Sequence, residues 1–152
     1  MAELGRGVKA GVFAGAISGF VIITITSIIA YIFSKNKALI TFSVIVLLFI
    51  LVLMITIRFT TEGLVLGVIF SLLYRFIPTE KSTYKAIIFS LFIAAISIGA
   101  LLIAQRFYPG ALLKYAGIGN YSVYLIILIL LVQALFRGYL LGYFWDKFGT
   151  AT

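Results

Sequence analysis

The sequence has no cysteine and no histidine, and only four of its residues are acidic. These absences exclude disulfides and thiolate nucleophiles, and they remove the usual protein ligands of zinc, haem and iron–sulfur clusters. Of the four carboxylates, Glu3, Glu80 and Asp146 lie near the ends of expected helices or in a loop. No acid–base pair and no activated nucleophile can be built from this set. We therefore expect no enzymatic activity, no catalytic residue, no metal and no cofactor.

Charge of either sign is scarce, because charged residues make up 11% of the chain and hydrophobic residues 64%. Average soluble domains are about one quarter charged. Five stretches carry no charge at all: residues 10–33, 38–57, 63–74, 86–105 and 115–136. A helix needs about 20 mostly apolar residues to cross a bilayer, whereas barrel strands alternate polar and apolar residues. The composition therefore predicts an all-α integral membrane helical bundle, multi-pass in the cell membrane.

The number of spans depends on how residues 38–77 are divided. Four long transmembrane helices would cover about 9–33, 44–76, 84–106 and 120–147, with loops at 78–85 and 106–120. The alternative has five spans, with a turn at 58–62, because Arg58 and Glu62 interrupt the apolar run. We expect four spans, because a weak internal repeat favours them.

The repeat relates two halves, approximately 9–77 and 84–148, of a single transmembrane domain covering 1–152. "KAGVF" (9–13) matches "KAIIF" (85–89), and "EGLVLGVIF" (62–70) matches "RGYLLGYFW" (137–145) with both glycines aligned. Internal repeats are common in membrane proteins. The second match lies inside the last helix, so its counterpart in the first half should also lie inside one long helix.

The net charge of +8 comes from basic residues that lie mostly near the ends of the expected helices. Such residues contact anionic headgroups and set orientation, so we expect the lipid bilayer, and no nucleic acid, as their partner. In the four-span arrangement both termini and the 78–85 loop share a side, which carries Arg6, Lys9, Arg75, Lys81, Lys85 and Lys147. The other side carries Lys35, Lys37, Arg106 and Lys114. This excess predicts that both termini are cytoplasmic. Aromatic residues near helix ends, such as Tyr74 and Trp145, are expected at headgroup depth.

Glycine recurs at every fourth position of "GVKAGVFAGAISG" (7–19). The same GxxxG spacing occurs twice more, so the candidate helix-packing residues are Gly7, Gly11, Gly15, Gly19, Gly63, Gly67, Gly138 and Gly142. Spacing of four gathers these small residues on one face of a helix, where the backbones of two helices can approach closely in lipid. The spacing leaves open whether the partner helix belongs to this chain or to another.

A candidate intramembrane charge cluster contains Arg58, Glu62, Arg137 and Gln133. Arg58 and Glu62 share a helix face at i and i+4. Glu62 and Arg137 occupy equivalent positions in the repeat, and they lie at similar depths when counted from the basic residues that follow them. We expect a Glu62–Arg137 ion pair inside the bundle, with the other two residues one turn away. Ionisable residues within a membrane usually mark a pair, a pathway or a bound ligand.

Two functions fit these features. The first is a helix-packing structural or accessory subunit of a larger membrane complex or homo-oligomer, with other membrane-protein subunits or copies of itself as partners. The alternative is a small oligomeric transporter or channel that uses the Glu/Arg site.

Overall fold

The computed structural model describes residues 2–33, 42–107 and 123–149. These residues contain no strand. They form four helices: α1 (Ala2–Phe33), α2 (Phe42–Leu73), α3 (Ser82–Phe107) and α5 (Val123–Gly149). Each contains a segment long and apolar enough to cross a membrane: Glu3–Ile25, Val52–Leu73, Ser82–Ala104 and Ile127–Gly149. The prediction of an all-α membrane bundle with four long spans is confirmed.

Residues 58–62 lie inside α2, so the five-span alternative with a turn there is wrong. Arg58 and Glu62 interrupt the apolar run in composition, but an i, i+4 ion pair is compatible with continuous helix. The N-terminal helix also differs from expectation, because it begins at Ala2 rather than near residue 9. Its first turns carry Glu3, which pairs with Arg75 just after the end of α2, and Arg6, which pairs with Asp146 of α5. The predicted loop at 106–120 falls almost entirely outside the described residues.

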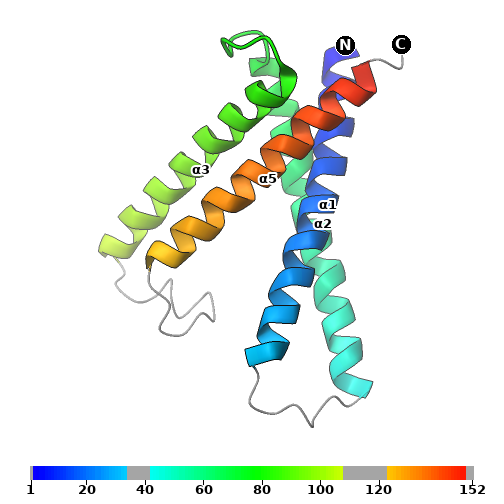
Figure 1. The fold of residues 1–152 in the computed structure, drawn as a ribbon, viewed down its shortest axis with the longest axis vertical. Helices are drawn as coiled ribbons and strands as arrows, with labels where there is room; N and C mark the ends of the chain where they lie inside the picture. The colour runs from blue at the N-terminus through cyan, green and yellow to red at the C-terminus, as the bar shows by residue number, and fades with distance from the viewer. Residues whose placement is uncertain (1, 34–41, 108–122, 150–152) are drawn as a thin grey trace.

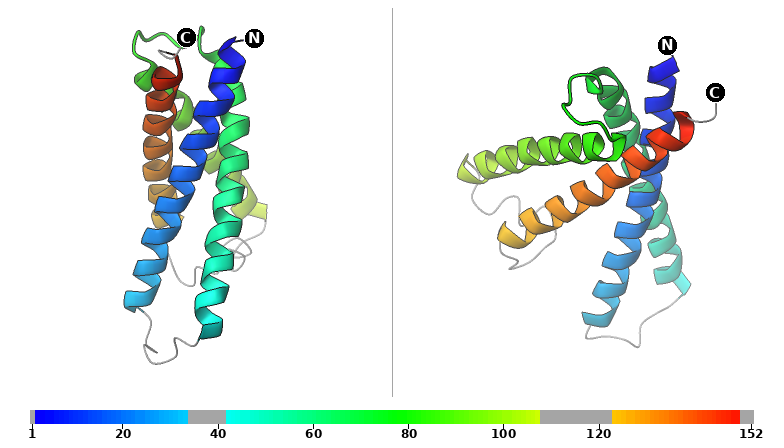
Figure 2. Two further views of the ribbon diagram at one scale, coloured as in Figure 1. Left: turned by 90° about the vertical axis from the view of Figure 1, so that its right-hand side faces the viewer. Right: turned by 45° about the horizontal axis from the view of Figure 1, so that its top comes forward.

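The helices are arranged as two antiparallel hairpins (Figure 1). α1 packs along α2, α3 packs along α5, and α1 also contacts α5. The hairpins meet near the end of the molecule that holds both termini and the α2–α3 connection, and they diverge towards the opposite end (Figures 1 and 2). The fold is therefore closed at one end and splayed at the other.

An aromatic cluster fills the closed end. Trp145 is 1% exposed, stacks on Tyr74 with ring centroids 4.6 Å apart, and meets the edge of Phe70 at 5.1 Å. Arg6 from α1 lies over the Trp145 ring at 4.7 Å and pairs with Asp146 at 3.8 Å. Trp145 thus lies near a helix end, as expected, and its ring is packed between the hairpins.

Candidate functional site

The first hairpin is built on direct backbone contact between glycines. A Cβ added at Gly63 would lie 2.7 Å from the Gly15 Cα, and one added at Gly67 would lie 2.9 Å from the Gly11 Cα. A Cβ at Gly7 would likewise overlap the Gly67 carbonyl oxygen. Real Cβ atoms do not approach backbone so closely, so only glycine permits this separation of α1 and α2. The structure places the candidate glycines of α1 against those of α2.

At the other end of this face, Gly19 meets a side chain. A Cβ added there would lie 2.6 Å from the Phe59 Cβ. Ala10, Ala14 and Ser18, which alternate with the glycines, are also buried. The glycine face of α1 is thus covered by its own hairpin partner over several turns.

The second hairpin uses the glycines of α5 in the same way. A Cβ at Gly138 would lie 2.8 Å from the Ile87 Cα of α3, and one at Gly142 would overlap the Thr83 Cα. Two other glycines differ: a Cβ at Gly5 or Gly99 would meet nothing within 4 Å. The candidate glycines of all three helices therefore lie at helix–helix contacts within this chain.

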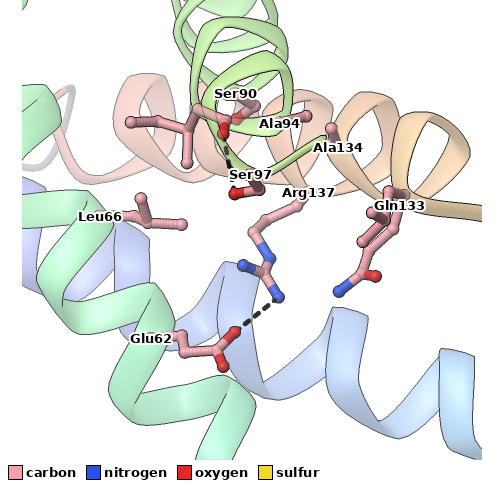
Figure 3. A pocket seen from close by; sticks show the side chains of 10 residues that line it. Glu62, Leu66, Ser90, Ala94, Ser97, Gln133, Ala134 and Arg137 are labelled. Atoms are coloured by element: carbon pink, nitrogen blue, oxygen red, sulfur yellow. Dashed lines mark hydrogen bonds and ion pairs between the residues drawn. The ribbon is translucent and has the colours of Figure 1, made fainter. Parts of the chain in front are cut away.

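The charged residues of α2 face away from α1, because Gly63 and Gly67 occupy the side that α1 covers. Arg58 Nε donates to Glu62 Oε1 at 3.1 Å. Arg137 Nη2 of α5 donates to Glu62 Oε2 at 3.4 Å, as Figure 3 shows. The Arg137 guanidinium also lies 5.0 Å from the centre of the Phe59 ring. The structure thus brings together Glu62 and Arg137, the pair expected from the sequence, and joins the two hairpins through them.

This ion pair lies deep within the apolar part of both helices. Glu62 is near the middle of the segment Val52–Leu73, and Arg137 is near the middle of Ile127–Gly149. Exposure is unequal: the side chain of Arg137 is 12% exposed, that of Glu62 42%, and that of Arg58 77%. One arginine is therefore enclosed between the hairpins, and the other lies on the outer surface of the chain.

A cavity of about 150 Å³ opens beside the pair, between α2, α3 and α5 (Figure 3). Its lining is Glu62, Leu66, Ser90, Ile93, Ala94, Ser97, Leu130, Gln133, Ala134 and Arg137. Gln133, the fourth member of the expected cluster, thus lines the same cavity one turn from Arg137. A more open cleft shares several of these residues and continues past Thr61 and Val65 to the surface.

Two buried polar groups of this cavity lack hydrogen-bond partners among the described residues, namely Ser90 Oγ and Arg137 Nε. Ser97 lies about two helical turns further along α3. It differs from Ser90 because its hydroxyl donates to the Ile93 carbonyl at 2.9 Å. Sequence reasoning did not single out Ser90, because a serine in an apolar helix commonly bonds to the preceding turn. Its importance depends on the position of α5, which the sequence alone does not give.

A second hollow, of about 460 Å³, separates α1 from α5 towards the splayed end. Its lining is apolar except for Gln133: Val21, Ile22, Ile25, Leu128, Ile129, Val132 and Phe136 supply the rest. The splay of the hairpins therefore creates a polar cavity on one side of α5 and an apolar hollow on another.

The chemistry available to the site is that of charge and hydrogen bonding. Within residues 2–33, 42–107 and 123–149, no group of three or more acidic, histidine or cysteine side chains comes close enough to hold a metal ion. The polar groups that line the cavity are the acceptor Glu62, the donor Arg137, and Ser90, Ser97 and Gln133, which can both donate and accept. No protein-family model, curated protein or solved structure matches the chain.

Proposed function

We propose that the protein is a helix-packing accessory subunit that assembles with other membrane proteins or with copies of itself. The observation that carries this proposal is Arg58, whose side chain is 77% exposed near the midpoint of α2. A charged side chain at such depth is costly in lipid, and it usually faces a protein interior or a water-filled cavity. A neighbouring chain that covers Arg58 would remove this cost.

The splayed hairpins support the same proposal. Large apolar side chains line the hollow between α1 and α5, and neither helix fills it. In lipid, helices associate through close packing and not through a hydrophobic driving force. A hollow between two helices of one chain is a surface on which a further helix can make such packing contacts.

We also propose that the two hairpins are copies of one structural unit. Gly63 approaches the Gly11 carbonyl in the first hairpin, and Gly138 approaches the Ala86 carbonyl at the equivalent place in the second. In the same way, Gly67 approaches the Gly7 carbonyl, and Gly142 approaches the Ser82 carbonyl. Each pair of equivalent residues is separated by 75 positions, as are Glu62 and Arg137. Equivalent contacts at a constant offset support the internal repeat expected from the sequence.

Photo-crosslinking in native membranes tests the proposed assembly. A benzoylphenylalanine placed at Ile57, next to Arg58 and 56% exposed, should form protein adducts, which mass spectrometry then assigns to this chain or to another. Phe92 of α3, 61% exposed, is the matched control position on the other hairpin. Lipid adducts alone at Ile57, as at a lipid-facing residue, would reject the proposal.

A transporter or channel is a second candidate, and the cavity beside Glu62 and Arg137 favours it. Ionisable residues that line an intramembrane cavity are typical of ion and proton paths. In reconstituted vesicles, this candidate predicts a flux of ions or protons that Glu62→Gln abolishes. The absence of any flux from the wild-type protein would reject it and leave the accessory-subunit proposal intact.

A further inference from the structure

We propose that the cavity between α2, α3 and α5 binds a singly charged anionic group through Arg137 and Ser90. The group is either a small free anion or the phosphate of an anionic lipid, which present the same chemistry to the site. This inference does not depend on the accessory-subunit function, because the cavity lies within one chain.

The first support is the pair of unpartnered donors. Ser90 is 5% exposed, and neither its Oγ nor Arg137 Nε has a hydrogen-bond partner among the described residues. Both residues line the same cavity, one from α3 and one from α5 (Figure 3). A buried donor left unsatisfied is costly, and hydrogen bonds between charged groups are the strong ones. Both atoms are covered by the surrounding protein, so an anion in the cavity would accept from both groups once the side chains that cover them shift.

The second support is the charge balance. Arg58, Arg137 and Glu62 together carry one net positive charge, because two guanidinium groups share a single carboxylate. Each oxygen of Glu62 already accepts a hydrogen bond from an arginine. A cation would therefore find a carboxylate that is already paired and a guanidinium that repels it. Arg58 lies on the outer surface and does not line the cavity, so an anion beside Arg137 would neutralise the excess charge of the cluster across Glu62.

The third support is space and access. The cavity of about 150 Å³ has room for several water molecules or one phosphate-sized group, since a water takes about 30 Å³ in the liquid. The adjoining cleft connects it to the surface between α2 and α3. A free anion could enter by this path, and a lipid phosphate would reach Arg137 only if the headgroup left the membrane surface and entered the cleft to the depth of the charge cluster.

The test uses the full chain in neutral detergent and two probes. Chloride binding is measured from the line width of ³⁵Cl nuclear magnetic resonance, and lipid binding from phosphatidylglycerol retained in native mass spectrometry, with phosphatidylcholine as the neutral comparison. We expect one of the two probes to bind. Ser90→Ala and Arg137→Lys should weaken that binding about tenfold, the effect of losing one hydrogen bond to a charged group.

The matched control is Ser97→Ala, which removes a lining hydroxyl that is already bonded to the Ile93 carbonyl. It should leave binding unchanged. Chloride binding alone assigns the site to a free anion, and selective phosphatidylglycerol binding assigns it to a lipid. The proposal is overturned if neither probe binds the wild type, or if Ser90→Ala binds as well as the wild type.

A second measurement, on the Ser90 variant, does not depend on whether the Arg137 variant folds. Ser90→Ala removes an unpartnered buried hydroxyl, so in anion-free buffer its thermal midpoint should equal or exceed that of the wild type. With the bound probe present, the wild type and Ser97→Ala should gain stability equally, and Ser90→Ala should gain less at the same probe concentration. A lower midpoint for Ser90→Ala without anion would show that the hydroxyl is satisfied inside the protein, which also contradicts the proposal.

Discussion

A single carboxylate at mid-membrane depth connects the two hairpins. Glu62 accepts from Arg58 on its own helix and from Arg137 on α5, at 3.1 and 3.4 Å. Arg137 is the more enclosed of the two arginines, at 12% exposure of its side chain. Removing Glu62 would leave the enclosed Arg137 without its counter-charge, which is destabilising for a charge held between helices. The pair therefore constrains how α2 and α5 are placed, whatever its net contribution to stability.

Charge reversal tests this pairing. Glu62→Arg and Arg137→Glu, made singly, each place like charges together and should lower the thermal midpoint in mild detergent by several degrees or more. The double reversal restores an opposite pair and should recover part of the loss; adding Arg58→Glu should recover more, because Arg58 would otherwise repel the new arginine. A double variant no more stable than the worse single variant would show that the two side chains do not pair.

At the scale of the helices, α2 uses different faces to contact different neighbours. α2 turns Gly63 and Gly67 towards α1 and turns Glu62 towards α5. Glycine in a helix costs up to about 1 kcal/mol relative to alanine, and close packing of backbones must offset this in lipid. The overlap that a Cβ would create at these positions explains why glycine is needed there.

Gly11→Ala and Gly99→Ala should therefore have opposite effects. A Cβ at Gly11 would overlap the Gly63 carbonyl and lie 2.8 Å from the Gly67 Cα, so the helices must separate, at a cost of about 1–3 kcal/mol. A Cβ at Gly99 meets nothing within 4 Å, so alanine should be neutral or stabilising by up to about 1 kcal/mol. Thermal unfolding in the same detergent compares them. Equal effects of the two substitutions would contradict the proposed role of the α1–α2 contact.

The membrane-spanning helices could be predicted from the sequence, because long uncharged runs in lipid favour continuous helix over other backbone structures. The start of α1 could not be predicted, because the length of an apolar run does not reveal ion pairs between distant residues. Here Arg6 pairs with Asp146 at 3.8 Å, and Glu3 pairs with Arg75 at 3.3 Å. The glycine spacing identified contact faces but not their partners. Ser90 becomes notable only once α5 covers it, because sequence spacing does not specify which helices meet.

At the scale of the whole molecule, the hairpins are joined at one end and separate at the other. Trp145, Phe70 and Tyr74 pack together at the joined end, where both termini lie (Figure 1). Lys85 reinforces this end, with its ammonium 3.0 Å from the Tyr74 carbonyl and 4.2 Å from the centre of the Tyr74 ring. If each of the four described helices crosses the membrane, α1 begins and α5 ends on the same side, and we propose from the basic residues there that this side is cytoplasmic.

Cysteine labelling tests this orientation, since the sequence has no cysteine of its own. An impermeant maleimide added to intact cells should label Arg106→Cys, at the splayed end, but label Glu80→Cys only after permeabilisation. Both native side chains are exposed in the structure, so accessibility is not limited by packing. Labelling of both sites from the same side would contradict the four-span arrangement, and the reverse pattern would invert the proposed orientation.

The most direct test of the central claim is the mass of the particle extracted from native membranes with an amphipathic polymer and resolved by native mass spectrometry. The exposed Arg58 and the hollow between the hairpins predict an assembly, either a multiple of the 16.7 kDa chain or that chain with other membrane subunits. A single 16.7 kDa chain accompanied only by lipid would contradict the claim.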